Sequence, residues 1–123
     1  MSLSRRIDII SIILYSAGRE AFEFVGSSLE DLKAFPAEAR RAAGFELSFV
    51  QRGLEPSDWK PMKEVGAGVR EIRIHVLGEW RVLYVAKCAE AVYVLHAFQK
   101  KTKSTSKEDI ELARKRFREI GGQ

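Results

Sequence analysis

The residues of this chain that are best suited to chemistry are basic, and they are concentrated near its C-terminal end. Residues 99–118 hold eight Lys or Arg and three acidic residues, an excess of five positive charges in a chain whose net charge is +4. Lys100, Lys101 and Lys103 lie in one short run, with Thr102 between them. Because the positive charge is concentrated and not spread, we expect a surface that binds a phosphate backbone.

Two arginines upstream extend this basic region onto predicted strands. In the segment 70–77, apolar residues alternate with Glu71, Arg73 and His75, so the polar set is expected to face away from the core. Arg81 shares that outer face if His75 lies opposite Arg81 across a tight turn. Arg73 would then be a diagonal neighbour of Arg81, about 7–8 Å away. Two guanidiniums and an imidazole on one open sheet face would repel one another unless an anion lies between them.

Each of these features also has an ordinary structural interpretation. Glu71 can neutralise Arg73, charged pairs are common on exposed strands, and a lysine run is often only a solvated loop. His75 and His96 are each more often packed or surface residues than catalytic ones. The strands that carry Arg73, Arg81 and the start of the lysine run are expected to be sheet neighbours, however. This convergence of basic residues favours a binding surface.

Composition limits the class of protein. At 123 residues, with 46% hydrophobic and 31% charged content, the chain fits one globular domain. Cys88 is the single cysteine, which excludes an intramolecular disulfide and a cysteine-rich metal site. The sequence has no nucleotide-binding loop, His-Glu-x-x-His motif or paired-carboxylate set, and Gly66-x-Gly68 is better interpreted as a turn. We therefore expect neither a metal nor a cofactor.

The N-terminal residues 1–18 are set apart from the rest. Arg5 and Arg6 precede an apolar run over 7–14, which resembles the start of a signal peptide. The run is too short to span a bilayer, contains polar residues and is followed by a poor cleavage site. We therefore expect an N-terminal extension over 1–18, one domain over 19–123, and a cytoplasmic protein without membrane association.

Turn and capping signals divide the rest of the chain into seven elements. A strand is predicted over 21–25, followed by a helix from the capping box that begins at Ser27 and a second helix from Pro36 to Gly53. Three strands are predicted over 70–77, 80–87 and 91–98. A last helix is predicted after the capping box Thr105-Ser106-Lys107-Glu108. Residues 55–61 are predicted to be an irregular connection. The order β-α-α-β-β-β-α predicts an α+β fold, with a small, mainly antiparallel sheet and helices packed on one face.

Four segments match a known pattern: DWKPMK at 58–63, VREIRI at 69–74, WRVLYV at 80–85 and LHAFQKKT at 95–102. Through them the chain, from about Ala21 onward, resembles the phage-derived, HigB-type branch of the RelE/HigB-like toxin superfamily. The resemblance implies a RelE-like fold and cleavage of mRNA in the ribosomal A site. It also implies a helix-turn-helix, HigA-like antitoxin, which holds the toxin inactive in a hetero-oligomer.

The resemblance also implies roles for particular residues. It matches Arg81 to the family's hairpin arginine, Arg73 to the basic residue of the preceding strand, Lys100 and Lys101 to its basic cluster, and Lys60 and Lys63 to lysines that grip the backbone. The catalytic candidates are Arg73, Arg81, Lys101, His75 and His96. The candidates for RNA or ribosome binding are Lys60, Lys63, Arg70, Phe98, Lys100, Thr102 and Lys103, with Trp80 as a second nearby aromatic residue. The chain departs from the pattern in lacking a tyrosine after the basic cluster.

Metal-independent cleavage of RNA is a chemistry that these residues can support. The 2′-hydroxyl attacks the adjacent phosphate, so the site must fix the phosphate, stabilise its developing charge and transfer protons. Arg73 and Arg81 suit the charge, because guanidinium donors match phosphate oxygens in pairs. Lys101 or a histidine can transfer protons. Without a clear acid–base pair, such a site would depend on the ribosome to position the substrate.

Two alternatives remain open. A ParE-like toxin of the same superfamily would act on DNA gyrase without catalysis. A phage-derived nucleic-acid-binding module would keep the fold with an inactive site. The presence of Arg73, Arg81 and Lys101 together favours the ribonuclease.

Overall fold

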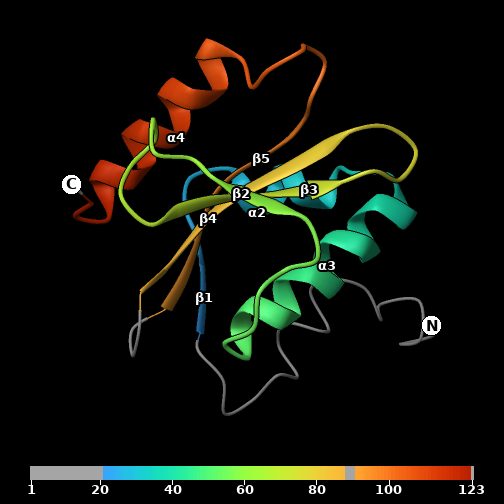
Figure 1. Cartoon of the computed structure of the whole chain (residues 1–123), viewed down its shortest axis with the longest axis horizontal. Helices are drawn as coiled ribbons and strands as arrows, with labels where there is room; N and C mark the ends of the chain where they lie inside the picture. The colour runs from blue at the N-terminus through green and yellow to red at the C-terminus, as the bar shows by residue number, and fades with distance from the viewer. Residues whose placement is uncertain (1–20, 88–90, 123) are drawn as a thin grey trace.

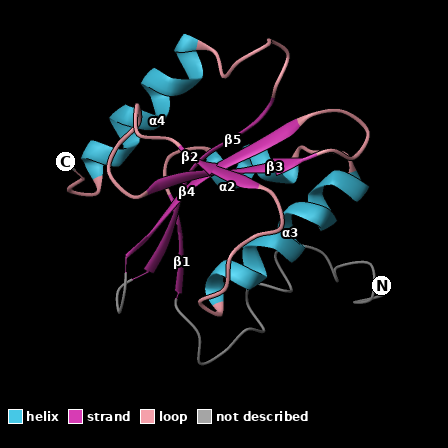
Figure 2. Ribbon diagram, viewed as in Figure 1, coloured by secondary structure: helices cyan, strands magenta, loops and turns pink. Residues whose placement is uncertain are grey.

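A five-stranded sheet organises the protein, in a computed structural model that describes residues 21–87 and 91–122 (Figures 1 and 2). The predicted extension over 1–18 and Cys88 lie outside the described residues. The elements are β1 (Ala21–Phe24), α2 (Ser28–Lys33), α3 (Ala37–Gln51), β2 (Trp59–Pro61), β3 (Val69–Ile74), β4 (Trp80–Lys87), β5 (Ala91–Gln99) and α4 (Lys107–Glu119). The strand order is β1-β5-β4-β3-β2, with β1 parallel to β5 and the other pairs antiparallel. The predicted α+β class and mainly antiparallel sheet are confirmed.

The strand β2 is an addition to the predicted order. It lies in the segment 55–61, which we expected to be irregular, and it pairs with β3 so that Lys60 is opposite Glu71. Three residues are too few to show an alternating pattern. Pro61 suits this edge position, because an edge strand need not donate a ladder hydrogen bond on its outer side.

The register of β3 and β4 differs from the predicted one. Arg73 lies directly opposite Arg81, and the last pair is Ile74 with Trp80, so the connecting loop is longer than a tight turn. His75 therefore lies in this loop and not opposite Arg81. The expectation that the two arginines share one face is confirmed, but they are direct cross-strand partners and not diagonal neighbours.

Both faces of the sheet pack against helices, as Figure 2 shows, whereas we expected helices on one face only. Helices α2 and α3 cover one face, where Leu32 and Leu47 pack with Ile72 and Val82. Helix α4 covers part of the other face through a second apolar cluster, whose members are Met62, Val65, Val69, Leu83, Val85, Leu95, Ala113 and Phe117. The sequence did not reveal this second layer, because β3 contributes only Val69 to it and the other β3 residues of that face, Glu71 and Arg73, are charged.

The two predicted capping boxes have different outcomes. Ser27 precedes α2, but its hydroxyl bonds the Asp31 carboxylate at 2.8 Å and makes no capping bond to the backbone. Helix α4 begins one residue later than predicted, with Ser106 as its cap. The Ser106 hydroxyl oxygen accepts from the backbone N–H of Asp109 at 3.1 Å, and its proton is donated to the Asp109 carboxylate at 2.7 Å. Asp109 is thereby held in a fixed position at the start of α4.

Arg116 connects helix α4 to strand β5 and to the turn before α2. Its guanidinium donates to the carbonyl of Leu95 at 2.8 Å and to the hydroxyl of Ser27 at 2.9 Å. Gly26 makes this approach possible, because a Cβ there would lie 2.6 Å from Nε of Arg116. Gly26 also has φ +58°, a value that other residues rarely adopt. Across the described ranges, no helix is long and apolar enough to cross a membrane.

Candidate nucleic-acid interface

A row of three residues crosses the three central strands of the sheet, near the end that carries the β3–β4 loop and on the face that α4 partly covers. Arg73 on β3 lies opposite Arg81 on β4, which lies opposite Phe98 on β5. Residues in register on neighbouring strands share a face, so the two arginines and the aromatic ring form one line. Trp80 is not part of this line. It is buried on the other face against Phe35, with ring centroids 4.6 Å apart.

Arg81 is buried and already neutralised by the protein's own acids. Its side chain is 5% exposed and lies 3.7 Å from the carboxylate of Glu71 and 3.2 Å from that of Glu79. It also donates to the carbonyl of Trp80 at 3.0 Å. Glu71 is only 1% exposed and accepts a hydrogen bond from the hydroxyl of Thr105 at 2.7 Å. The two arginines therefore need no external anion between them. The sequence analysis considered Glu71 as the acid that neutralises Arg73, but in the structure Glu71 neutralises Arg81.

Arg73 is more accessible and more loosely held. Its side chain is 35% exposed, and its nearest carboxylate is that of Asp58, at 4.0 Å. The Nε atoms of Arg73 and Arg81 are both buried and have no hydrogen-bond partner among the described residues. Buried donors of this kind are uncommon in folded proteins and call for an explanation, such as a catalytic role or a bound water or ion. Arg73 is thus the better placed of the two arginines to bind a phosphate oxygen.

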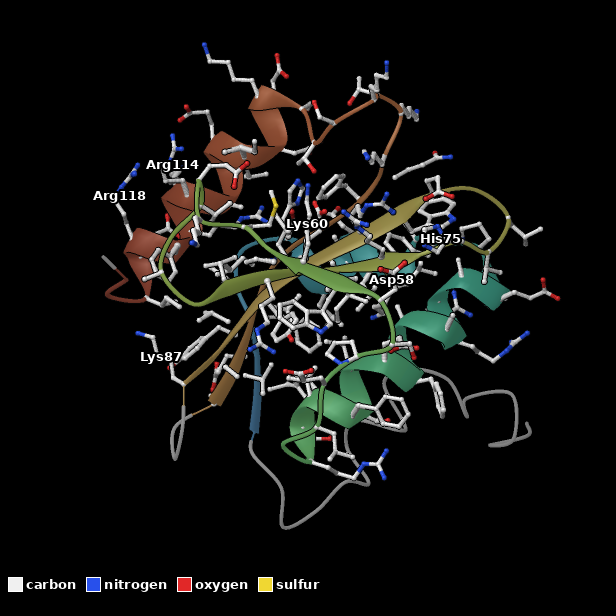
Figure 3. All side chains as sticks on the ribbon, in the orientation of Figure 1. Asp58, Lys60, His75, Lys87, Arg114 and Arg118 are labelled. Carbon is white, nitrogen blue, oxygen red and sulfur yellow. The ribbon has the colours of Figure 1, made fainter. Side chains whose placement is uncertain are left out.

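His75 connects the two arginines through carboxylates. Its Nε2 lies 2.7 Å from Asp58 and its Nδ1 lies 2.8 Å from Glu79, the acids that pair with Arg73 and Arg81 respectively. Figure 3 shows His75 and Asp58 side by side. The hydrogen bonds to Asp58 and then to Glu79 raise the pKa of His75, because they stabilise the imidazolium. The result is a chain of alternating charges from Arg73 to Arg81.

His96 lies one row away from the arginines, opposite Leu83, and is buried. Its Nε2 is 2.7 Å from the carboxylate of Asp109, and its ring stacks on Phe98 with centroids 4.6 Å apart. Burial lowers the pKa of His96, and this effect outweighs the opposing hydrogen bond to Asp109. The two candidate histidines therefore differ: His75 favours the charged form and His96 the neutral form.

The candidate lysines lie around the arginine row. Lys60 is opposite Glu71 on the edge strand β2, and Lys63 is exposed just beyond it. The backbone N–H of Lys100 donates to the carbonyl of Glu79 at 2.7 Å, which fixes the start of the lysine loop beside the β3–β4 loop. Lys101, Thr102 and Lys103 follow in this exposed loop, where the Thr102 hydroxyl bonds the carbonyl of Ser104.

Two groups of basic residues lie away from the arginine row. Arg70 lies three residues before Arg73 on β3, so its side chain is on the opposite face of the sheet. Its guanidinium carbon is 4.0 Å from the centroid of the Trp59 ring, and its Nη1 is 3.7 Å from the carboxylate of Glu55. Arg114 and Arg118 on α4 lie at the far side of the molecule from His75 in Figure 3. The positive charge of residues 99–118 is therefore divided between two regions, with the buried Arg116 contributing to neither.

The acids are the residues that the sequence analysis missed. Asp58, Glu79 and Asp109 each hold a candidate side chain, yet none was assigned a role from the sequence. Only Glu79 carried a local signal, since it lies four residues after His75. In the part of the chain that the structure describes, no group of three or more His, Cys, Asp and Glu is arranged to hold a metal ion.

The fold is a small α+β fold of RelE-like type. A family model, described as Phage derived protein Gp49-like (DUF891), matches residues 30–118. The chain therefore belongs to this Gp49-like, phage-derived family. No curated protein matches the sequence. The family match supports the predicted phage-derived origin. It also indicates that the protein is a toxin-like protein or a phage module.

Proposed function

We propose that the protein is the toxin of a type II toxin–antitoxin system and that it cleaves mRNA in the ribosomal A site. The observation that carries this proposal is the row of Arg73, Arg81 and Phe98, with its two Nε donors that make no hydrogen bond among the described residues and the lysines around it. Guanidinium donors bind phosphate oxygens, and an aromatic ring can stack with an unpaired base. The row thus offers both kinds of contact to single-stranded RNA.

The residues divide the reaction between them. Arg73 binds the scissile phosphate, and Arg81, fixed by Glu71 and Glu79, holds a guanidinium donor at a constant position beside it. The 2′-oxygen then attacks phosphorus, the bond to the 5′-oxygen breaks, and the leaving oxygen takes up a proton. His75 suits the donor role because it favours the imidazolium form, provided that it releases Asp58 or Glu79. Lys101 remains the candidate for removing the proton of the 2′-hydroxyl.

The proposal also covers the branch of the toxin, its antitoxin, its location and its RNA contacts. A toxin of the HigB-type branch would be held inactive by a helix-turn-helix, HigA-like antitoxin in a hetero-oligomer. It would act in the cytoplasm, where ribosomes present mRNA. Lys60, Lys63, Lys100 and Lys103 would contact RNA backbone or ribosomal RNA, because phosphate contacts from exposed lysines add affinity without base specificity.

The test is single-turnover cleavage of A-site mRNA on saturating ribosomes, together with a ribosome-binding titration. Arg73→Ala should lower the bound cleavage rate by about 10²–10³-fold, the scale for losing one such donor. Arg70→Ala is the comparison, because it removes the same side chain from the same strand on the opposite face. If both variants cleave at the wild-type rate once bound, this sheet face has no catalytic role.

A further inference from the structure

A shallow pocket of about 300 Å³ lies at the open edge of β5. Strand β1 pairs only with residues 91–94 of β5, so the edge beyond residue 94 is not covered by a strand. The pocket is lined by three aromatic side chains and three polar ones: Phe35, Trp80, Phe98, Asp31, His96 and Gln99. Aromatic walls with a few polar groups are typical of sites that bind one planar ring.

His96, which lines this pocket, has a buried acceptor without a partner among the described residues. The Asp109 carboxylate can only accept, so Nε2 of His96 carries the hydrogen that joins them at 2.7 Å. The Ser106 hydroxyl donates to the other oxygen of Asp109 at 2.7 Å, which fixes the carboxylate. In the neutral ring, Nδ1 is then an acceptor, and it has no partner among the described residues although His96 is only 5% exposed.

The other polar groups of the pocket are also mostly acceptors. Asp31 is half-buried and has one carboxylate oxygen bonded to the hydroxyl of Ser27 at 2.8 Å. Gln99 is exposed and contributes an amide, which has both a donor and an acceptor. The two ring donors are already engaged, because Nε1 of Trp80 bonds the carbonyl of Val76 at 2.9 Å and Nε2 of His96 bonds Asp109. A ring with exocyclic amino hydrogens would satisfy these acceptors better than one with carbonyl groups.

We propose that this pocket binds one unstacked nucleobase of single-stranded RNA and prefers a base with an exocyclic amino group. Phe98 belongs both to the pocket and to the row of Arg73 and Arg81, so a base in the pocket would place its phosphate beside that row. The inference rests on the proposed function for its choice of RNA as the ligand. It adds a base-selecting site to the phosphate-binding one.

The experiment uses the fluorescence of Trp80, made the sole reporter by Trp59→Phe, because the chain has two tryptophans. The probes are 2′-O-methyl RNA pentamers of cytosine, of uracil and of abasic residues, which carry equal charge and cannot be cleaved through the 2′-oxygen. The cytosine pentamer should change Trp80 emission and bind about tenfold more tightly than the abasic one. Cytosine should also bind more tightly than uracil, which has a carbonyl in place of the amino group.

Two variants with matched charge test the pocket itself. Asp31→Asn removes an acceptor from the pocket, and Glu38→Gln removes one negative charge from the exposed first turn of α3. Both should raise affinity for the abasic pentamer similarly, but only Asp31→Asn should reduce the ratio of cytosine to uracil affinity. His96→Phe keeps an aromatic ring without the acceptor and should reduce the same ratio.

The outcomes separate this inference from the proposed function. Equal affinity for all three pentamers, with no change in Trp80 emission, would overturn the base pocket even if the protein cleaves mRNA on ribosomes. Base-dependent binding by a chain that does not cleave mRNA would support the pocket and contradict the ribonuclease. A ratio that Glu38→Gln changes as much as Asp31→Asn would also overturn the pocket.

Discussion

At the scale of single residues, the buried pair of Arg81 and Glu71 combines a structural and a functional task. Both side chains are almost fully removed from water, and Glu71 has a second partner in Thr105. Removing one member of such a pair leaves the other as an uncompensated buried charge. A loss of cleavage in an Arg81 variant is therefore not by itself evidence for a catalytic role.

We predict that Arg81→Ala lowers the free energy of unfolding by about 3–5 kcal/mol, because Glu71 remains buried without its partner. The double variant Arg81→Leu, Glu71→Leu should recover much of this loss, since two apolar side chains leave no unpaired charge. Urea unfolding of both variants measures the difference. If Arg81→Ala has the wild-type urea midpoint, the ion pair contributes nothing to stability and its loss affects the site alone.

At the scale of elements, the β3–β4 loop is positioned by ion pairs as well as by the packing of Val76 against the core. Leu77 in this loop is 66% exposed and has a positive φ of 56°. His75 bonds Asp58 before β2 and Glu79 at the end of the loop, so it connects the loop to the edge of the sheet. The charge of His75 should therefore decide how firmly this loop is held.

The pH dependence of stability tests this role of His75. Its pKa is raised in the folded protein, so its contribution is fully present below the ordinary value of 6.5 and is lost as the pH rises through the folded value. His75→Ala should therefore lower the urea midpoint at pH 5.5 and change it little at pH 8.5. Wild-type protein at each pH is the reference, which removes the opposite contribution of His96. An equal loss at both pH values would contradict the ionic role.

At the scale of the whole molecule, two apolar clusters on opposite faces of the sheet hold the surface with the arginine row in place. The cluster under α2 and α3 fixes the sheet, and the cluster under α4 fixes the segment that follows β5. Arg116 joins α4 to both β5 and the turn before α2. The arginine row and the base pocket thus lie between elements from both halves of the chain, and their geometry depends on the complete fold.

The toxicity of the complete chain distinguishes the proposed function from its alternatives. Induced without an antitoxin, wild-type protein should arrest growth, with cleaved mRNA and normal DNA supercoiling, and Arg73→Ala should not. The measurements are mapping of mRNA ends and plasmid topology after induction. Gyrase-dependent DNA breaks with intact mRNA would support a ParE-like toxin. Normal growth on induction of stable wild-type protein would indicate an inactive phage-derived module.

The sequence by itself determined most of the elements and their order, because these follow from local patterns. Alternation in 70–77 placed Arg73 on the face opposite Ile72. By the same alternation Arg70 belongs on the Ile72 face, although we named it as a candidate for RNA binding. The hairpin-length gaps fixed the antiparallel order of β3, β4 and β5. These signals lie within a few residues of each other, so no tertiary contact was needed to interpret them.

Only the tertiary structure decided which side chains meet. The pairs Arg81 with Glu71, Arg73 with Asp58 and His96 with Asp109 join residues that are separated by 10 to 15 positions and lie on different elements. Their formation depends on register, on the short strand β2 and on α4 packing against the second face. A pattern in the sequence shows which face a residue occupies, but the partner that neutralises it is fixed by the packing of distant segments.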